Sequence, residues 1–280
     1  MSSVAGTLDT AALALSTHYS TRSHLTVPHR AHQRRLPATL AAGLLAALCL
    51  SGPAEAIETV PLFSSATPGL ELPTGWARVP VNARKAQTDY ELVAGDGAVV
   101  LHARARSAAS FALRELPAGR PFDLLHHPNV HWRWRLGQLP RGADNAVGAK
   151  EDAAARLVFM FDGDRAQLPF RDRAVMRMAD MLSGHPMPYA TLMYVTSSVA
   201  PVGTVIANPH TRRVQMVVAA QADDAVGRWQ VLSRDVVRDY RSVFGEDPGP
   251  LIAYGVMTDS DNTGSEAEAW YGDIVFSATP

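Results

Sequence analysis

The sequence predicts a mainly β protein, an antiparallel β-sandwich with two short peripheral helices. Three observations lead to this prediction. Short segments of strand composition follow one another along the chain, Gly, Pro or Asp residues close them, and only two stretches show helical spacing. Because the strands do not alternate regularly with helices, a sheet built from βαβ units is not expected.

The strands are predicted from alternation and from turn residues. Residues 94–97, Ala-Gly-Asp-Gly, separate two of them and are typical of a hairpin turn. In residues 130–136, VHWRWRL, apolar and charged residues alternate strictly, which is the period of a half-buried strand. The predicted strands are TDYELV (88–93), AVVLHARA (98–105), ASFALREL (109–116), VHWRWRL (130–136), ARLVFMF (155–161), YATLMYV (189–195), RVQMVVAA (213–220), RWQVLS (228–233), PLIAYGVM (250–257) and AWYGDIVF (269–276).

Two stretches have helical spacing instead. Residues 171–183 repeat apolar residues at the spacing of one helix face, and Gly184 followed by Pro186 predicts where the helix ends. Residues 233–244 begin with a Ser/Asp cap and stop before a glycine. No internal repeat or linker separates these elements, so residues 57–280 are predicted to form a single β-sandwich domain.

Residues 1–56 are predicted to be a leader that is removed. A basic pair at 34–35 precedes an apolar run at 36–50, and an A-x-A motif predicts cleavage between Ala56 and Ile57. A membrane anchor is the weaker alternative, because a Ser-Gly-Pro triplet ends the apolar run too early to cross a bilayer. We therefore expect a periplasmic or secreted protein with no membrane span after cleavage.

Composition excludes several kinds of function. The formal net charge of −1 at pH 7, without a Lys/Arg-rich run in the body of the chain, argues against a nucleic-acid partner. The only cysteine, Cys49, lies in the apolar run of the leader, so the mature chain is predicted to have no disulfide, thiol nucleophile or thiolate metal site. No G-x-S-x-G, H-E-x-x-H, P-loop or dinucleotide motif occurs in the sequence.

The alternating strand at 130–136 supplies the first candidate ligand-binding residues. Trp132 and Trp134 share one face, and we expect them in the core rather than in an open platform for sugar rings. Arg133 and Arg135 then project from the opposite face. Their guanidinium groups are suited to carboxylates, either of a ligand or of neighbouring acidic residues.

Polar loops supply further candidates. Asp162 and Asp164 follow a strand, and two carboxylates at this spacing bind a hard cation, share acid/base chemistry or form an ordinary turn. Two later loops each carry a histidine, and these loops would meet in one cleft if they form a ligand site. Their candidate residues are His185, Tyr189, Asn208 and His210.

The acidic loop at 259–264 matches the first half of a calcium-loop template. Oxygen-bearing residues stand at its first, third and fifth positions and a glycine at the sixth, but the twelfth position is Trp270 instead of Glu. The loop supplies about four of the six to eight oxygens that calcium needs, so a cation would need help from residues such as 161–164. The alternative is a turn that binds its own backbone, with no cofactor. The cation-ligand candidates are Asp259, Asp261 and Thr263, and Asn262 is a further ligand-binding candidate.

Six stretches together resemble an exported bacterial family called domain of unknown function 3047. These stretches are HWRWRLGQLPRGAD, ARLVFMFDGD, GHPMPYATLMYV, VGTVIANPHTRRV, RDVVRDYRSVFGEDPGPLI and VMTDSDNTGSEAEAWYGDI. The resemblance covers about residues 72–276 and implies one compact domain in the cell envelope, without an assigned activity. The C-terminal half is also similar to the last strands of jelly-roll carbohydrate-binding modules, through Trp229 and Asp273-Ile274, which implies a jelly-roll-like sandwich.

Three functions are consistent with these features. The leading hypothesis is a non-catalytic protein that binds a glycan or another polar component of the envelope. The alternative is a polysaccharide hydrolase or lyase, which requires two loop carboxylates facing each other across a groove, roughly 5 to 10 Å apart. A third hypothesis is a structural or assembly partner in the envelope, which predicts an exposed apolar patch. The carboxylates considered for catalysis are Asp162, Asp164, Asp259 and Asp261.

Overall fold

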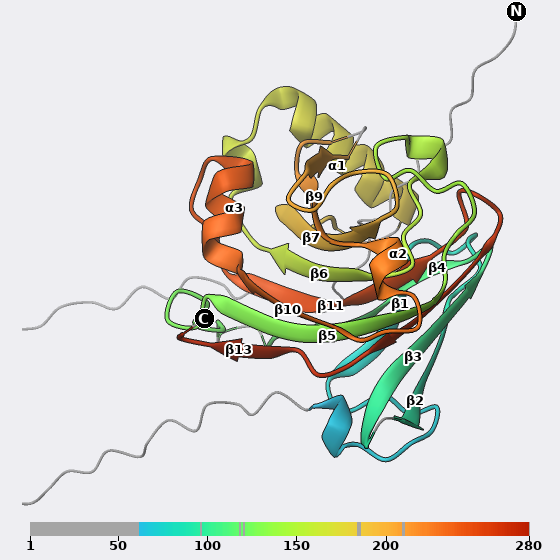
Figure 1. The fold of residues 1–280 in the computed structure, drawn as a ribbon. Helices are drawn as coiled ribbons and strands as arrows, with labels where there is room; N and C mark the ends of the chain where they lie inside the picture. Colours follow the sequence, from blue (N-terminus) through green and yellow to red (C-terminus); the bar gives the residue numbers. More distant parts are fainter. Residues whose placement is uncertain are drawn as a thin grey trace, which may run out of the picture. The chain divides into compact units, whose positions relative to one another are not determined.

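Two β-sheets pack face to face in a jelly-roll-like sandwich (Figure 1). The computed structural model describes residues 62–95, 97–117, 119, 121–183, 186–208 and 211–279. The predicted leader and its cleavage site lie outside these residues. Within the described part of the chain, no helix is both long enough and apolar enough to cross a membrane. The predicted fold class is confirmed.

The larger sheet has seven strands in the order β1-β4-β11-β6-β7-β9-β8. Its neighbours run antiparallel, except that β7 and β9 are parallel. Because a parallel pair cannot be joined by a tight hairpin, the chain passes through the edge strand β8 between them. The strands are β1 (Trp76–Pro80), β4 (Ala109–Glu115), β6 (Arg156–Phe161), β7 (Ala190–Ser197), β8 (Val205–Ala207), β9 (Val214–Gln221) and β11 (Leu251–Asp259).

The smaller sheet has six strands, with the order β10-β5-β12-β3-β2 and β13 also paired with β5. All its pairs are antiparallel. β12 lies beside the second half of β5, and β13 lies beside its first half. The strands are β2 (Asp89–Gly95), β3 (Ala98–Arg106), β5 (Asn129–Gln138), β10 (Gln230–Asp235), β12 (Glu266–Tyr271) and β13 (Val275–Ser277).

Both predicted helices are present. α1 (Phe170–Ser183) agrees with the prediction to one residue. α3 (Val236–Phe244) begins later than predicted, because the residues before it complete β10 and Asp235 then caps the helix by accepting the Arg238 N–H at 2.8 Å. Shorter elements are α2 (Ala222–Ala225) and the 3-10 turns η1 (Phe63–Ser65), η2 (Gly148–Lys150) and η3 (Arg165–Gln167).

The sandwich core lies between the sheets and contains the two tryptophans of β5. Trp132 and Trp134 are 3% and 0% exposed, which confirms the prediction that they are core residues. The Trp132 ring stacks on Tyr194 of the larger sheet with 5.4 Å between ring centroids. Burial of a large apolar side chain contributes about 1.5–3 kcal/mol, so both tryptophans stabilise the packing of the two sheets.

α1 lies over the other face of the larger sheet (Figure 1), and a second apolar layer packs between the helix and this face. Met176 and Ala179 of α1 pack in one cluster with Val158 of β6 and Met216 of β9. The helix therefore covers one face of the larger sheet, while the outer face of the smaller sheet points away from it. In the described part of the chain, no α-helix covers the sheet face from which Arg133 and its neighbours project.

Candidate functional site

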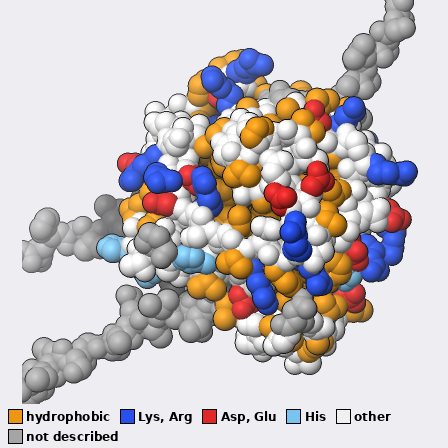
Figure 2. Space-filling view, in the orientation of Figure 1, with side chains coloured by type: hydrophobic (Ala, Val, Ile, Leu, Met, Phe, Trp, Pro, Cys, Tyr) orange, Lys and Arg blue, Asp and Glu red, His pale blue; other side chains and the backbone are white. Residues whose placement is uncertain are grey.

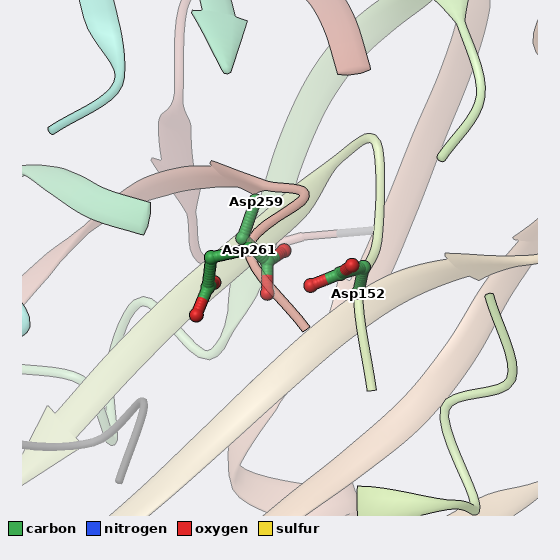
Figure 3. Close-up of side chains that lie close together, drawn as sticks. All are labelled: Asp152, Asp259 and Asp261. Carbon is green, nitrogen blue, oxygen red and sulfur yellow. The ribbon is translucent and has the colours of Figure 1, made fainter. Parts of the chain in front are cut away.

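The acidic loop after β11 is part of a cluster of three carboxylates. Asp259 and Asp261 approach Asp152, which comes from the loop before β6 (Figure 3). One oxygen from each of these three side chains lies within 4.8 Å of the others. We call Asp152, Asp259 and Asp261 the acidic cluster. Carboxylate oxygens at this spacing are chemically suited to a hard cation.

Each carboxylate of the acidic cluster already has partners within the protein. The buried Arg156 guanidinium donates from Nε and Nη2 to the two oxygens of Asp259, both at 2.9 Å. Lys85 Nζ lies 2.5 Å from Asp261. Burial raises the pKa of the Asp259 carboxyl to about 7, although the attraction of Arg156 opposes this rise. Two cationic side chains therefore supply positive charge where a metal ion would supply it.

The predicted ligands Asn262 and Thr263 hold the loop in place. Asp152 accepts hydrogen bonds from the backbone N–H of Asn262 at 3.1 Å and from that of Thr263 at 2.7 Å. The Thr263 hydroxyl also donates to Asp152, at 2.6 Å. These bonds join the loop to the chain segment before β6 and favour the interpretation of residues 259–264 as a structured turn.

The loop at 161–164 does not assist the acidic cluster. Asp162 and Asp164 follow the last residue of β6, whereas Arg156 is its first residue and touches Asp259. Asp162 accepts from the Gly163 N–H at 2.8 Å, and Asp164 caps η3 by accepting from Ala166 at 2.9 Å. The prediction that residues 161–164 would supply further ligands to the 259–264 loop is therefore wrong, because the third carboxylate of the cluster is Asp152. The four acids considered for catalysis are divided between the two ends of β6.

The remaining loop candidates gather at the Asp162 end of the larger sheet. Arg213 Nε donates to the Tyr189 carbonyl at 2.9 Å, and Arg213 Nη2 donates to Glu246 at 2.6 Å. Burial raises the pKa of the Tyr189 hydroxyl, and the negative charge of Glu246 also acts in this direction. Asn208 is buried and accepts from the Thr211 N–H at 3.3 Å. These contacts tie the loops together internally. The two loop histidines, His185 and His210, lie outside the described residues.

Arg133 and Arg135 lie on the outer face of the smaller sheet, in a row of planar side chains. The Arg135 guanidinium is 4.5 Å from the Trp270 ring centroid and 5.3 Å from that of Trp229. Arg133 is 4.5 Å from the Trp229 ring centroid. On the other side of Trp270 the His102 ring stacks at 4.7 Å, with 7° between the two planes. We call these five side chains the stacked row.

Strand register produces the stacked row. Trp270 of β12 is directly paired with His102 of β3 and with Arg135 of β5. Directly opposed residues of antiparallel strands have Cβ atoms about 4.5–5.5 Å apart, so their side chains stand side by side on one face. Gly137 leaves room for the Trp270 ring, because a Cβ at this position would lie 2.7 Å from its Cζ3 atom.

Two carboxylates flank the histidine at one end of the row. His102 Nδ1 lies 3.1 Å from Glu91, and His102 Nε2 lies 2.8 Å from Glu268. Partial burial favours a raised pKa of the Glu268 carboxyl, but hydrogen bonds from His102 and Arg104 outweigh it and lower this pKa. Glu268 is therefore held as a carboxylate beside Trp270.

A polar groove continues the surface beyond His102. It has a volume of about 520 Å³ and runs along β2, the edge strand of the smaller sheet. Its lining includes acidic and basic side chains together with apolar surface. The charged and titratable lining residues are Glu71, Arg78, Asp89, Tyr90, Glu91, His102 and Arg104. The groove and the stacked row share the buried His102, so they adjoin each other at this residue.

Sequence reasoning identified the two arginines of this surface but not their neighbours. His102 and Trp270 lie in predicted strands, and Glu268 lies beside one of them. Alternation alone assigns each to a face of its own strand. It does not show that the three strands are adjacent, because their residues are far apart in the chain. Trp229 is adjacent to Arg135 through the pairing of β10 with β5, which is also a long-range contact.

The chain is similar to one protein family and to solved structures. The model of a family described as "Protein of unknown function (DUF3047)" matches residues 74–275. None of the curated proteins matches the sequence. One similar solved structure is the family 30 carbohydrate-binding module of the cellulosomal cellulase Cel9D-Cel44B of Clostridium thermocellum. Its TM-score is 0.38, its sequence identity is 11%, and the match covers 76% of this chain and 94% of the module. Another is a meso-active thermostable cellulase derived from Cel12A of Rhodothermus marinus, with TM-score 0.37 and 13% identity over 74% of this chain and 97% of the cellulase.

Proposed function

The chain belongs to the DUF3047 family, and we propose that this member is a non-catalytic, exported protein that binds a polysaccharide on the outer face of its smaller sheet. The observation that carries the proposal is the stacked row, in which two arginines and two tryptophans alternate across neighbouring strands. All four side chains are half-buried, so they are ordered by packing and still reach the surface.

The chemistry of the stacked row favours a glycan that carries acidic groups. A guanidinium packed against an indole ring keeps its N–H donors in its own plane, where they point past the ring edge. Arg133 has no ion pair with a carboxylate among the described residues, so its charge is available to a ligand. Carboxylate and hydroxyl oxygens of an acidic polysaccharide match such donors, and the indole edges provide apolar contact.

The carboxylates considered for the alternative function do not support catalysis. A hydrolase or lyase needs two acids on opposite sides of one substrate groove. Asp162 and Asp164 lie at one end of β6, whereas Asp259 lies at the other end and is bound by Arg156. Asp259 is also only 2% exposed, which keeps it away from a polymeric substrate. This arrangement supports binding rather than hydrolysis as the function of the chain.

Export is part of the proposal and rests on the leader pattern. The apolar run at 36–50 and the A-x-A motif ending at Ala56 support secretion across the inner membrane. A periplasmic or extracellular location places the smaller sheet where envelope polysaccharides are found. Amino-terminal sequencing of the exported protein tests this part, because the mature chain should begin at Ile57.

Affinity electrophoresis tests the binding site directly. The parent protein should be retarded in gels containing polygalacturonate and much less in gels containing a neutral glucan. Arg133→Ala should weaken the interaction about tenfold, since a hydrogen bond to a charged group contributes about 1.5–3 kcal/mol. Trp229→Ala should weaken it further, because Arg133 and Arg135 both pack on this ring.

The matched control is Arg238→Ala. Arg238 is an exposed arginine of α3, outside the stacked row, so its loss removes the same charge without changing the proposed site. If Arg133→Ala and Arg238→Ala migrate alike, or if no acidic polysaccharide retards the parent protein, the stacked row is not the binding surface.

A further inference from the structure

The outer side of α1 carries large apolar side chains that no described element covers. Phe170, Met178 and Met181 are 71%, 48% and 77% exposed. Scattered single apolar residues are normal on protein surfaces, whereas three on one side of one helix form a patch. The opposite side of the same helix, with Met176 and Ala179, is buried against the larger sheet.

The exposed side of α1 is organised as an apolar stripe with basic borders. At 3.6 residues per turn, Phe170, Met181 and Met178 follow one another around the outer side of the helix. Arg177 falls on one border of this stripe and Arg171 on the other, and both arginines are exposed. Figure 2 shows hydrophobic and basic side chains side by side on the surface where Figure 1 places α1.

Charge identifies the kind of partner that this side of the helix fits. Among the described residues, neither Arg171 nor Arg177 has an ion pair with a carboxylate. The nearby acid Asp180 is already bound to Arg165, at 2.8 Å. An apolar stripe between unneutralised arginines is complementary to a surface that is anionic outside and apolar within, which is the interface of a bilayer with acidic headgroups.

We propose that α1 docks this protein onto the surface of a bilayer containing anionic lipids. Phe170, Met178 and Met181 would enter the boundary between headgroups and acyl chains, and Arg171 and Arg177 would stay at headgroup level with their apolar stems along the stripe. The helix lies in the interface and does not span the membrane. The larger sheet beneath it provides a rigid base, because α1 is packed into the second apolar layer.

This inference is independent of the proposed glycan site. The stacked row is on the outer face of the smaller sheet, whereas α1 covers the larger sheet. A protein bound to lipid through α1 therefore keeps its stacked row accessible. Failure of either experiment leaves the other proposal standing, because the two tests change different residues and use different ligands.

Vesicle sedimentation tests the proposal with the exported form of the protein. The parent protein should sediment with vesicles of equal phosphatidylglycerol and phosphatidylcholine and remain in solution with pure phosphatidylcholine. Arg171→Gln with Arg177→Gln should weaken binding about 25-fold, since each basic residue near an anionic surface changes affinity about fivefold. Phe170→Ser with Met181→Ser should abolish sedimentation, because the inserted apolar area is lost.

Two substitutions on other surfaces serve as controls. Arg238→Gln removes an exposed arginine of α3, and Val231→Ser removes an apolar side chain that is 80% exposed on β10. Both variants should sediment like the parent protein. All substituted positions are exposed, so the variants should keep the parent melting temperature within about 2 °C.

Three results would overturn the proposal. The first is that the parent protein shows no preference for anionic vesicles, either because it sediments equally with anionic and neutral vesicles or because it sediments with neither kind of vesicle. A second is unchanged binding when both arginines of α1 are replaced. The third is a parent protein that is dimeric by light scattering and becomes monomeric with Phe170→Ser and Met181→Ser, since the stripe would then be an interface between two copies.

Discussion

Asp259 combines two opposing effects in one side chain. It forms two hydrogen bonds with Arg156, yet it is only 2% exposed and another carboxylate of the acidic cluster is close by. Burial penalises the charged carboxylate more than Arg156 stabilises it, so its pKa is raised to about 7 from the ordinary 3.8. Glu151, which lies 3.7 Å from Arg156, also has a pKa raised by burial.

A pH dependence of stability follows from Asp259. Between about pH 4 and pH 7 the native state binds its proton more tightly than the unfolded state, so this contribution to stability falls as pH rises through that range. Glu268 has a lowered pKa, so its contribution to stability is lost only as pH falls below about 4.5, which is outside most of this range. Denaturant unfolding at pH 5 and pH 8 should show lower stability at pH 8, by roughly 1–4 kcal/mol.

Replacement of Asp259 identifies the titrating group. Asp259→Asn cannot titrate, so the difference in stability between pH 5 and pH 8 should shrink in this variant. Asp247→Asn is the matched control, because that aspartate has a 77% exposed side chain and should leave the difference unchanged. A parent protein whose stability rises between these two pH values would show that Arg156 outweighs burial at Asp259.

At the scale of the element, Gly255 of β11 allows this strand to lie very close to β4. A Cβ at Gly255 would lie 2.1 Å from the carbonyl oxygen of Ala112 on β4, and backbone atoms have little freedom to move away. Gly95 is the matched position in β2: a Cβ there would have no neighbouring atom within 4 Å, and its backbone is not left-handed. The two strand glycines therefore differ in the room available for a Cβ atom, and neither has a left-handed backbone.

Alanine substitutions at these two glycines should have different effects. Gly255→Ala should lower the free energy of unfolding by about 1–3 kcal/mol, because the paired strands β4 and β11 would have to separate inside the larger sheet. Gly95→Ala should change it by less than about 0.5 kcal/mol. Thermal unfolding of both variants measures the difference, and equal melting temperatures would show that the sheet accommodates the extra methyl group.

The helices show which element boundaries local sequence signals can predict and which they cannot. α1 agrees with its predicted range to within one residue because spacing, a following glycine and a proline all point to the same helix. The predicted start of α3 is three residues early, since the Ser/Asp pattern that signals a cap also ends β10. β8 has three residues, which is too short for a periodic pattern to be recognised. The single strand predicted at 269–276 is divided in the structure into β12, which ends at Tyr271, and β13, which begins at Val275.

At the scale of the whole molecule, the acidic cluster links the end of β11 to the segment before β6. Its negative charges are partly balanced by Arg156 and Lys85. We predict that neither 1 mM calcium nor a chelator changes the melting temperature, because the protein supplies its own cations. A calcium ion bound at 100 times its dissociation constant would stabilise the fold by about 2.7 kcal/mol, so a rise of several degrees with calcium would contradict this prediction.

Local sequence determined the class of fold and the face on which many residues lie. The period of two in a strand places Trp132 and Trp134 on one side and Arg133 and Arg135 on the other, whatever the rest of the chain does. Because large aromatic residues are more stable away from water, their side becomes the core and the arginines reach the surface. For this reason the two arginines of the stacked row were predictable from seven consecutive residues.

Only the tertiary structure decided which residues share a site. Trp270 meets His102 and Arg135 because β12 lies between β3 and β5 in one register, and a shift of one residue would turn it into the core. Asp152 joins Asp259 for a similar reason, through the pairing of β6 with β11. The sequence alone determines the period within each strand, whereas long-range pairing, which depends on the packing of the whole sandwich, determines the neighbours across strands.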